Sequence, residues 1–245
     1  MPPKVQRPTS VLIAFAAPPE GDAIRSGLGG DASTGFPLWE AVPVVDGFEM
    51  VRTGVGPAAA AGGVARVLDP ARHAAVISLG VGGALPGADT PEIGTVVLAT
   101  RSVFADLGLQ TPNEYQSLGE MGFPILGSGT GSGESYAPDS RLAGLLAPMA
   151  DRRAPVATVS TCSGTDDRAA AIAERLGSDR AGAVEAMEGA SVGLVASLVG
   201  VPFAELRVIS NTTGDRSAQR WDLDGAFARL GLVAGGLAGL DLVPR

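Results

Sequence analysis

Short apolar runs alternate with helix-like segments along most of the chain. The runs cover residues 10–16, 75–79, 95–100, 156–161 and 203–209. A continuous apolar run of this length is typical of a strand that is buried on both faces of a sheet. Helix-like composition covers residues 20–28, 57–68, 142–149, 166–176, 190–198 and 226–240. The alternation predicts an α/β fold, a three-layer sandwich in which helices cover both faces of a sheet.

Two further segments refine this plan. Residues 41–45 and 48–53 are joined by Asp46-Gly47, which predicts a β-hairpin. Residues 107–135 are rich in glycine and proline and predict a long excursion over the surface. No internal repeat and no sharp change of composition marks a boundary within the chain. We therefore expect one domain over residues 10–245, preceded by a flexible polar arm at residues 1–9.

Composition and charge exclude several classes of protein. Hydrophobic residues make up 45% of the 245 positions, so a large core is expected. The net charge of −8, with Lys and Arg scattered rather than clustered, disfavours a nucleic-acid partner. No apolar run reaches the roughly 20 residues of a membrane span. The single cysteine, Cys162, leaves no internal disulfide and fits a reducing compartment. We expect a soluble cytoplasmic protein.

Polar residues within the apolar last third of the chain indicate a ligand site. Glu185 and Glu188 lie at what reads as the start of a helix, and Asn211 ends a predicted strand. Buried polar groups of this kind cost free energy unless something binds them. Glu188 is a candidate for catalysis or ribose binding, and its alternative role is to complement the helix dipole, which suits Glu185 better. Asn211 either contacts a base or is an ordinary turn residue.

Glycine-rich strand ends supply the other candidate walls of this site. They cover residues 16–20, 54–56, 80–83 and 210–214. In α/β sheets ligands bind at such ends, and glycines let the backbone approach a flat ligand closely. Glu20 is either a general base or a solvated residue of a first helical turn. His73 is interpreted as structural or surface, and Cys162 as inert packing.

Cofactor and metal signatures are lacking in the sequence. No Gly-Lys-Ser/Thr follows the glycine-rich segments, so a triphosphate-binding loop is not expected. The chain has one histidine and one cysteine, without metal-ligand spacing, so no metal site is predicted. We expect a protein that works without a cofactor.

Several motifs, taken in order, resemble the nucleoside phosphorylase/nucleosidase superfamily over residues 10–230. They are Glu20 after the first strand, Gly-Val-Gly at 54–56, Leu-Gly-Val-Gly-Gly at 79–83, Ile-Gly-Thr-Val-Val at 93–97, Val-Glu-Ala-Met-Glu-Gly-Ala at 184–190 and Arg-Val-Ile-Ser-Asn at 207–211. The resemblance implies a central mixed, twisted sheet and cleavage of the N-glycosidic bond of a purine nucleoside through an oxocarbenium-like ribose. It also implies a homodimer or larger homo-oligomer.

The resemblance also implies roles for individual residues. Glu20 matches the carboxylate that activates water, and Met187 and Glu188 match contacts to the ribose. Gly82 and Gly83 match the backbone wall against the base. Trp221 matches the apolar residue that covers the 5′ substituent.

Three stretches are similar to the futalosine hydrolases within this superfamily. They are residues 104–108, residues 118–124, and residues 210–216 with their continuation to Trp221. This likeness implies release of hypoxanthine from futalosine, in menaquinone biosynthesis. Methylthioadenosine/S-adenosylhomocysteine nucleosidases have Asp where this chain has Asn211. Asn offers both a donor and an acceptor, which suits a 6-oxopurine.

Alternatives remain open at this level. Futalosine carries a benzoate carboxylate, for which Arg216 and Arg220 are candidate partners, and both also read as exposed arginines of an ordinary loop. A carboxylate at position 20 would repel phosphate, whereas Arg25 nearby keeps phosphorolysis open. The other functions considered are a methylthioadenosine/S-adenosylhomocysteine or aminodeoxyfutalosine nucleosidase, a purine nucleoside phosphorylase, and a nucleoside-binding protein without catalysis.

Overall fold

The computed structural model describes residues 8–31, 35–126 and 134–243. Most of the predicted polar arm, and residues 127–133 of the predicted excursion, lie outside the described residues. In chain order the elements are β1 (Ser10–Phe15), α1 (Pro18–Leu28), β2 (Ala41–Val45), β3 (Phe48–Arg52), α2 (Pro57–Val67), β4 (His73–Ala84), β5 (Val96–Phe104), β6 (Gly108–Gln110), β7 (Tyr115–Ser117), β8 (Ser135–Tyr136), α3 (Ser140–Leu146), a 3₁₀ turn (Ala147–Met149), β9 (Arg152–Thr158), α4 (Asp166–Arg175), β10 (Val184–Ala186), α5 (Gly189–Val199), β11 (Phe203–Thr212) and α6 (Leu223–Leu237).

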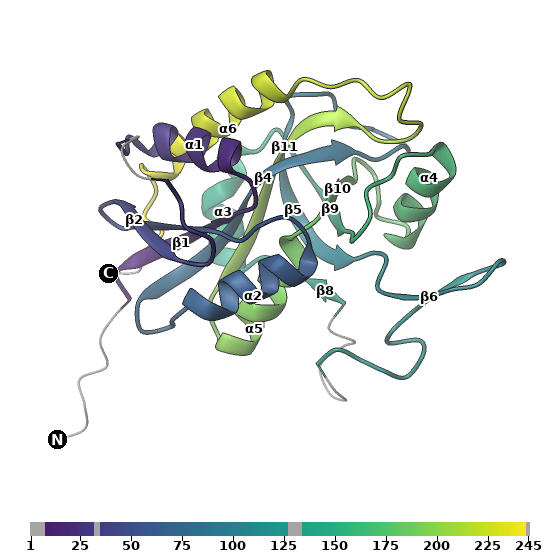
Figure 1. Ribbon diagram of the computed structural model, residues 1–245, viewed down its shortest axis with the longest axis horizontal. Coiled ribbons are helices and arrows are strands. Elements are labelled where there is room, and N and C mark those ends of the chain that lie inside the picture. The colour runs from purple at the N-terminus through teal and green to yellow at the C-terminus, as the bar shows by residue number, and fades with distance from the viewer. Residues whose placement is uncertain (1–7, 32–34, 127–133, 244–245) are drawn as a thin grey trace.

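A mixed sheet forms the centre of the molecule (Figure 1). Within the described residues it has nine strands in the order β10-β9-β5-β11-β4-β1-β3-β2, with β8 paired to β5. β4 runs parallel to β1 and β11, whereas β2 and β5 are antiparallel to β3 and β11. β10 pairs with β4 as well as β9, so this end of the sheet curls back on itself. The predicted α/β class with a mixed central sheet is confirmed.

Helices cover both faces of this sheet, as the burial of β1 shows. Val11, Ile13 and Phe15 pack in the core that contains residues of α1 and α6. Leu12 and Ala14 point the other way, into the core with α2 and α5. Alternate residues of a strand face opposite sides, so an uninterrupted apolar run fills two cores at once. Figure 1 shows α1 beside α6 on one face and α2 beside α5 on the other.

Several predicted boundaries shift in ways that have local physical causes. The hairpin at Asp46-Gly47 is confirmed as β2–β3, with Gly47 in the left-handed region (φ 79°). The first helix begins at Pro18 rather than Glu20, because proline needs no hydrogen-bonded N–H in a first turn. The strand predicted at 156–161 instead spans Arg152–Thr158.

The prediction that a helix opens near Glu185 is wrong. Val184–Ala186 forms β10, and α5 begins only at Gly189. Glu185 pairs with Gly83 on one side and with Ala157 on the other. Residues 80–83, interpreted as a glycine-rich turn, are likewise part of β4. Strand partners that are distant in sequence decide both segments, and local composition does not reveal them.

No helix in the described part of the chain is long and apolar enough to cross a membrane.

The close contact between α1 and α6 gives a test of the fold. A methyl group at Gly27 would collide with the backbone carbonyl of Gly231. Gly27→Ala is therefore expected to lower the free energy of unfolding by about 1–3 kcal/mol, since backbone cannot rotate away. Gly144→Ala in α3 is the matched control, because a methyl there meets no atom within 4 Å. We expect it to raise stability by about 0.5–1 kcal/mol. Urea denaturation measures both, and equal effects would contradict the packing described.

Candidate active site

A cavity of about 610 Å³ lies where the carboxyl ends of several sheet strands meet. Its walls come from the end of β1, the start of α1, residues 81–83 of β4, the loop after β9, β10, the end of β11, and the segment that leads into α6. Ligands of open α/β sheets bind in this kind of place. Eight of the nine predicted site residues line the cavity: Glu20, Gly82, Gly83, Met187, Glu188, Asn211, Arg216 and Trp221. Arg220 is exposed and is not among the lining residues of the described chain.

Glu20 is a buried carboxylate at the start of α1, so its interpretation as a solvated residue is wrong. Oε2 accepts hydrogen bonds from the N–H groups of Ala16 (3.0 Å) and Ala17 (2.9 Å), and Oε1 accepts one from Val81 (2.9 Å). Burial, and then the nearby Glu188 carboxylate, raise the pKa of Glu20 above its ordinary value, against the lowering effect of Arg207 and the N–H donors. A raised pKa suits a group that accepts a proton near neutral pH.

Glu188 lies at the N-cap position of α5 and is held from two sides. Oε1 accepts a hydrogen bond from the N–H of Gly56 (3.2 Å), and Oε2 forms an ion pair with Nη1 of Arg207 (3.2 Å). The Gly56 N–H comes from the loop before α2, so one carboxylate joins β11, α2 and α5. The rest of the Glu188 side chain borders the cavity beside Met187.

Arg207 organises these carboxylates, and sequence reasoning did not single it out. Its side chain is 3% exposed, within β11. Nε donates to Oε1 of Glu205 (2.7 Å), and Nη2 donates to Oγ of Ser78 (2.9 Å). Burial by itself would lower the pKa of Arg207, but the carboxylates of Glu205, Glu188 and Glu20 outweigh it and raise the pKa. One sequence signal could have identified Arg207: two charged residues, in Glu-Leu-Arg at 205–207, interrupt an otherwise apolar predicted strand.

Gly80 provides the space in which this cluster meets. A methyl group at Gly80 would collide with Oε1 of Glu20 and lie 2.8 Å from Nη1 of Arg207. The glycine therefore lets a carboxylate from α1 and a guanidinium from β11 approach over the same point of β4.

Asn211 lines the cavity because β11 is irregular at this point. The register between β11 and β4 shifts between Ile209 and Asn211, which pairs Asn211 with Gly83. Such a bulge redirects side chains, and both Ser210 and Asn211 line the cavity. Oδ1 of Asn211 accepts from the Ser210 hydroxyl (2.8 Å), and Nδ2 donates to the carbonyl of Thr212 (2.9 Å). One N–H and one lone pair of the amide stay available for a ligand.

Glu185 is a further buried carboxylate of the cavity. Oε1 accepts the Ser163 N–H (2.8 Å), and Oε2 accepts the hydroxyl of the same serine in a short hydrogen bond. Burial raises the pKa of Glu185, and the two Ser163 bonds act to lower it. Its predicted role at a helix start is excluded, because Glu185 belongs to β10.

The segment before α6 covers the open side of the cavity. The guanidinium of Arg216 lies 4.7 Å from the ring centroid of Trp221, whose side chain is 47% exposed. Oε1 of Gln219 accepts from Nη1 of Arg216 (2.8 Å) and Nε1 of Trp221 (3.1 Å). Nε2 of Gln219 donates to the carbonyl of Ser163 (3.0 Å), which ties this cover to the loop after β9.

Two residues considered in the sequence analysis, Cys162 and His73, are not placed to act as reactive groups. Cys162 borders the cavity, with Sγ 3.4 Å from Sδ of Met187, but burial and the carboxylates of Glu185 and Glu188 raise its pKa and keep it a thiol. His73 is buried at the start of β4, where Nδ1 accepts the Asp69 N–H (3.1 Å). Its surface interpretation is wrong. Among the described residues no group of three or more His, Cys, Asp or Glu side chains is placed to hold a metal ion.

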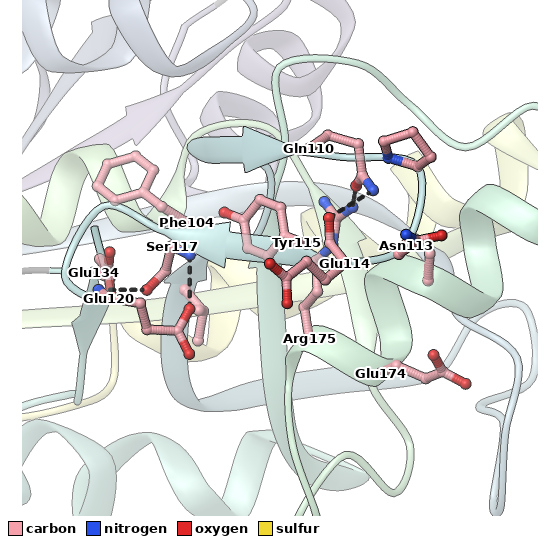
Figure 2. Close-up of a pocket in the computed structure, with 13 residues that line it drawn as sticks. Phe104, Gln110, Asn113, Glu114, Tyr115, Ser117, Glu120, Glu134, Glu174 and Arg175 are labelled. Atoms are coloured by element: carbon pink, nitrogen blue, oxygen red, sulfur yellow. Dashed lines mark hydrogen bonds between the residues drawn. The ribbon is translucent and has the colours of Figure 1, made fainter.

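A second cavity, of about 600 Å³, shares no residue with the first (Figure 2). It lies between the β6–β7 hairpin and α4. Arg175 stacks over the ring of Tyr115 at 3.9 Å and donates to Gln110 (2.6 Å), while the Ser117 N–H donates to Glu120 (2.7 Å). These contacts attach the excursion to α4, and none of the predicted site residues lies there.

Comparison with known proteins agrees with this geometry. Residues 48–234 match the model of the phosphorylase superfamily. A futalosine hydrolase of Streptomyces coelicolor is 34% identical over 238 residues, which cover 93% of this chain and 94% of that protein. A futalosine hydrolase of Acidothermus cellulolyticus is 35% identical and covers 89% of this chain and 86% of that protein.

Solved structures show the same fold at low identity. A 5′-methylthioadenosine/S-adenosylhomocysteine nucleosidase of Neisseria meningitidis, in complex with methylthio-immucillin-A, superposes with a TM-score of 0.71 at 16% identity over 95% of this chain and 100% of that one. A futalosine hydrolase of Helicobacter pylori superposes with a TM-score of 0.67 at 18% identity, covering 94% of each chain. The chain belongs to the phosphorylase superfamily and, within it, to the futalosine hydrolases.

Proposed function

We propose that this protein hydrolyses the N-glycosidic bond of futalosine, releases hypoxanthine, and acts in menaquinone biosynthesis. The observation that carries the proposal is that Glu20, Glu188 and Asn211 line one cavity from three different elements. Each supplies a different chemical requirement of the reaction. The futalosine hydrolases to which the chain is similar support the choice of substrate.

Glu20 is assigned the proton transfer. It accepts a proton from a water molecule as the water oxygen bonds to C1′ of the ribose and the bond from C1′ to N9 of the purine breaks. The transition state places positive charge on the ribose ring. Three buried carboxylates (Glu20, Glu188 and Glu205) share a single buried guanidinium, Arg207, within this cluster. The excess negative charge of this buried cluster favours a cationic ribosyl group.

Glu188 and Met187 are assigned to the ribose. A carboxylate accepts hydrogen bonds from both hydroxyls of a diol, and Arg207 fixes the orientation of Glu188. Gly82 and Gly83 form the wall against the base. Asn211 donates an N–H to the 6-oxo group. As the bond from C1′ to N9 breaks, the leaving purine takes a proton at N7 from a solvent water, and the remaining lone pair of Asn211 then accepts a hydrogen bond from that N7–H. Asn211 cannot transfer a full proton, so its help to the leaving group is a hydrogen bond.

Water, rather than phosphate, is the nucleophile in this proposal. Arg25 is not among the described residues that line the cavity beside Glu20. Arg25 is buried under the ring of Phe36, with its guanidinium 3.7 Å from the ring centroid. Glu20 would repel a phosphate anion at the place where a phosphorylase must bind it.

We also propose where the protein is located and how its chains assemble. The superfamily resemblance and the absence of a spanning helix in the described chain support a cytoplasmic enzyme. The same resemblance supports a homodimer or larger assembly of single-domain chains spanning residues 10–245. No cofactor is required by the chemistry assigned above.

Product analysis tests the proposed reaction. The protein is expected to release hypoxanthine from futalosine at a rate independent of phosphate. Inosine, aminodeoxyfutalosine and methylthioadenosine are the comparison substrates, and chromatography separates hypoxanthine from adenine. Adenine as the main product would remove the role given to Asn211. Phosphate-dependent release would replace hydrolysis by phosphorolysis, and tight binding without release would indicate a binding protein.

Glu20→Gln tests the general base. We expect kcat to fall by about 10²–10⁴-fold, whereas KM changes little because Glu188 and Met187 still hold the ribose. In the unmodified enzyme kcat should decline as pH falls through the raised pKa of Glu20, since the protonated carboxyl accepts no proton. Glu40→Gln, at an exposed carboxylate outside the cavity, is the control. Equal steady-state activity of the two variants would refute the role of Glu20.

The 5′ carboxylate of futalosine is assigned to Arg216, because it lines the cavity and Arg220 does not. Arg216 is exposed, and Arg216→Gln is expected to raise KM for futalosine by about two- to fivefold, the range of an exposed ion pair. KM for inosine, which lacks the carboxylate, should not change. Arg220→Gln is the matched control. A larger effect of Arg220→Gln on futalosine would reverse the assignment.

A further inference from the structure

Glu205 is a buried carboxylate to which the reaction above assigns no individual role. It lies in β11, its side chain has no exposed surface, and it is not among the described residues that line the cavity. Withdrawing a carboxylate from water is costly unless well-placed partners replace its hydration. An apolar residue at such a position is often no less stabilising. The partners of Glu205 therefore indicate what its charge does.

Three elements hold the Glu205 carboxylate in one orientation. Oε1 accepts a hydrogen bond from Nε of Arg207 (2.7 Å), and Oε2 accepts the hydroxyl of Ser102, in β5, in a short hydrogen bond. The carboxylate also lies against Gly189, the first residue of α5, where a methyl group would collide with it. The glycine thus leaves the space that the carboxylate fills, beside the residue that follows Glu188 in the chain.

Glu205 determines which way the guanidinium of Arg207 faces. The guanidinium is a rigid plane with five N–H donors, so a fixed Nε also fixes the directions of the other two nitrogens. Nη1 lies 3.2 Å from Oε2 of Glu188, and Nη2 donates to Oγ of Ser78 (2.9 Å). A chain of contacts therefore runs from β5 through Glu205 and Arg207 to Glu188, which lines the cavity.

The charge of Glu205 also acts on Glu20. Burial raises the pKa of Glu20 most, the Glu188 carboxylate at the start of α5 raises it further, and the Arg207 guanidinium in β11 lowers it. Backbone N–H groups from the turn before α1 and from β4 also bind this carboxylate. Arg207 is shared with Glu205, whose negative charge offsets the guanidinium. Without that charge, Arg207 would favour the ionised form of Glu20 more strongly and make it a weaker base.

We propose that Glu205 is a positioning residue of the reaction, with two effects. It orients Arg207 towards Glu188, which holds the ribose. It also offsets the positive charge of Arg207, so that Glu20 stays basic enough to take a proton from water. The inference rests on the proposed function and names a residue outside the cavity that supports it.

Glu205→Gln removes the charge and keeps the shape of the side chain. The amide oxygen can still accept from Nε of Arg207, and the NH₂ group can donate to Oγ of Ser102. We expect the acidic limb of the kcat–pH profile, which follows Glu20, to move at least about half a pH unit lower, because a nearby negative charge is gone. On the plateau kcat should fall about three- to tenfold, whereas KM stays within about twofold.

Glu205→Asp gives the opposite combination. It keeps the charge, but its shorter side chain cannot contact both Arg207 and Ser102. The acidic limb should stay in place, and KM for futalosine should rise at least about threefold because Glu188 loses its fixed partner. The same defect in both variants would make Glu205 merely structural. An unmoved limb in Glu205→Gln, or an unchanged KM in Glu205→Asp, would overturn the inference. If one variant does not fold, the other still tests it.

Glu49→Gln is the matched control. Glu49 is a buried strand carboxylate that accepts from Nε of Arg72 at 2.7 Å, the distance found between Glu205 and Arg207. It lies at the other end of the sheet, beside the first residues of β1 and β4. Loss of its charge should lower stability without moving the acidic limb. An equal shift of the limb in the two glutamine variants would overturn the link between Glu205 and Glu20.

A titration separates this inference from the proposed function. Carbon-13 NMR of the carboxyl carbons, with the Glu20 signal assigned by its loss in Glu20→Gln, follows the ionisation of Glu20 without any substrate. This signal is expected to titrate at least about half a pH unit lower in Glu205→Gln than in the unmodified protein. If that shift is seen but no hypoxanthine is released from futalosine, the proposed function fails and the coupling of Glu205 to Glu20 stands. Identical titrations in both proteins would overturn the inference, whatever the substrate.

Discussion

The buried guanidinium of Arg207 is the interaction on which the site depends. Withdrawing such a charge from water costs several kcal/mol unless well-placed partners surround it. Arg207 has them in Glu205 (2.7 Å) and Glu188 (3.2 Å), with Ser78 as a third partner. These partners come from β11, the start of α5 and β4. A single strand residue therefore fixes the positions of helix, strand and loop around the cavity.

The charge balance of this cluster connects stability with chemistry. Carboxylates outnumber the guanidinium, and Glu20 and Glu188 repel each other, which contributes to the raised pKa of Glu20. A folded protein tolerates this imbalance because backbone N–H groups at Ala16, Ala17, Val81 and Gly56 bind the two carboxylates. In the proposed reaction, the ribosyl cation of the transition state supplies the positive charge that this cluster lacks. The same feature that disfavours the empty site thus favours the transition state.

The pairing of the sheet strands determines which residues lie at each end of the cavity. In the proposed reaction, the cluster of Glu20, Glu188 and Arg207 lies at the sugar end of the cavity, and Gly83 and Asn211 lie at the base end. Glu185 and Asn211 both line the cavity beside Gly83 because β10 turns back to pair with β4, and because the register of β11 shifts before Asn211. The cover of Arg216, Gln219 and Trp221 is joined to the base end through Ser163.

The sequence by itself determined the α/β class, the hairpin at Asp46-Gly47, and eight of the residues that line the cavity, among them Glu20, Glu188 and Asn211. It could do so because apolar periodicity and turn residues act locally. The Met-Glu-Gly-Ala motif and the Arg-Val-Ile-Ser-Asn motif that ends at Asn211 are each a short run of consecutive residues that can be recognised in the sequence. Only the tertiary structure decided that Val184–Ala186 is a strand, since its partners, Gly83 and Ala157, are distant along the chain. It also decided between Arg216 and Arg220 as cavity residues, and it brought Arg207 to Glu188. Long-range pairing and burial set these features, and no local pattern encodes them.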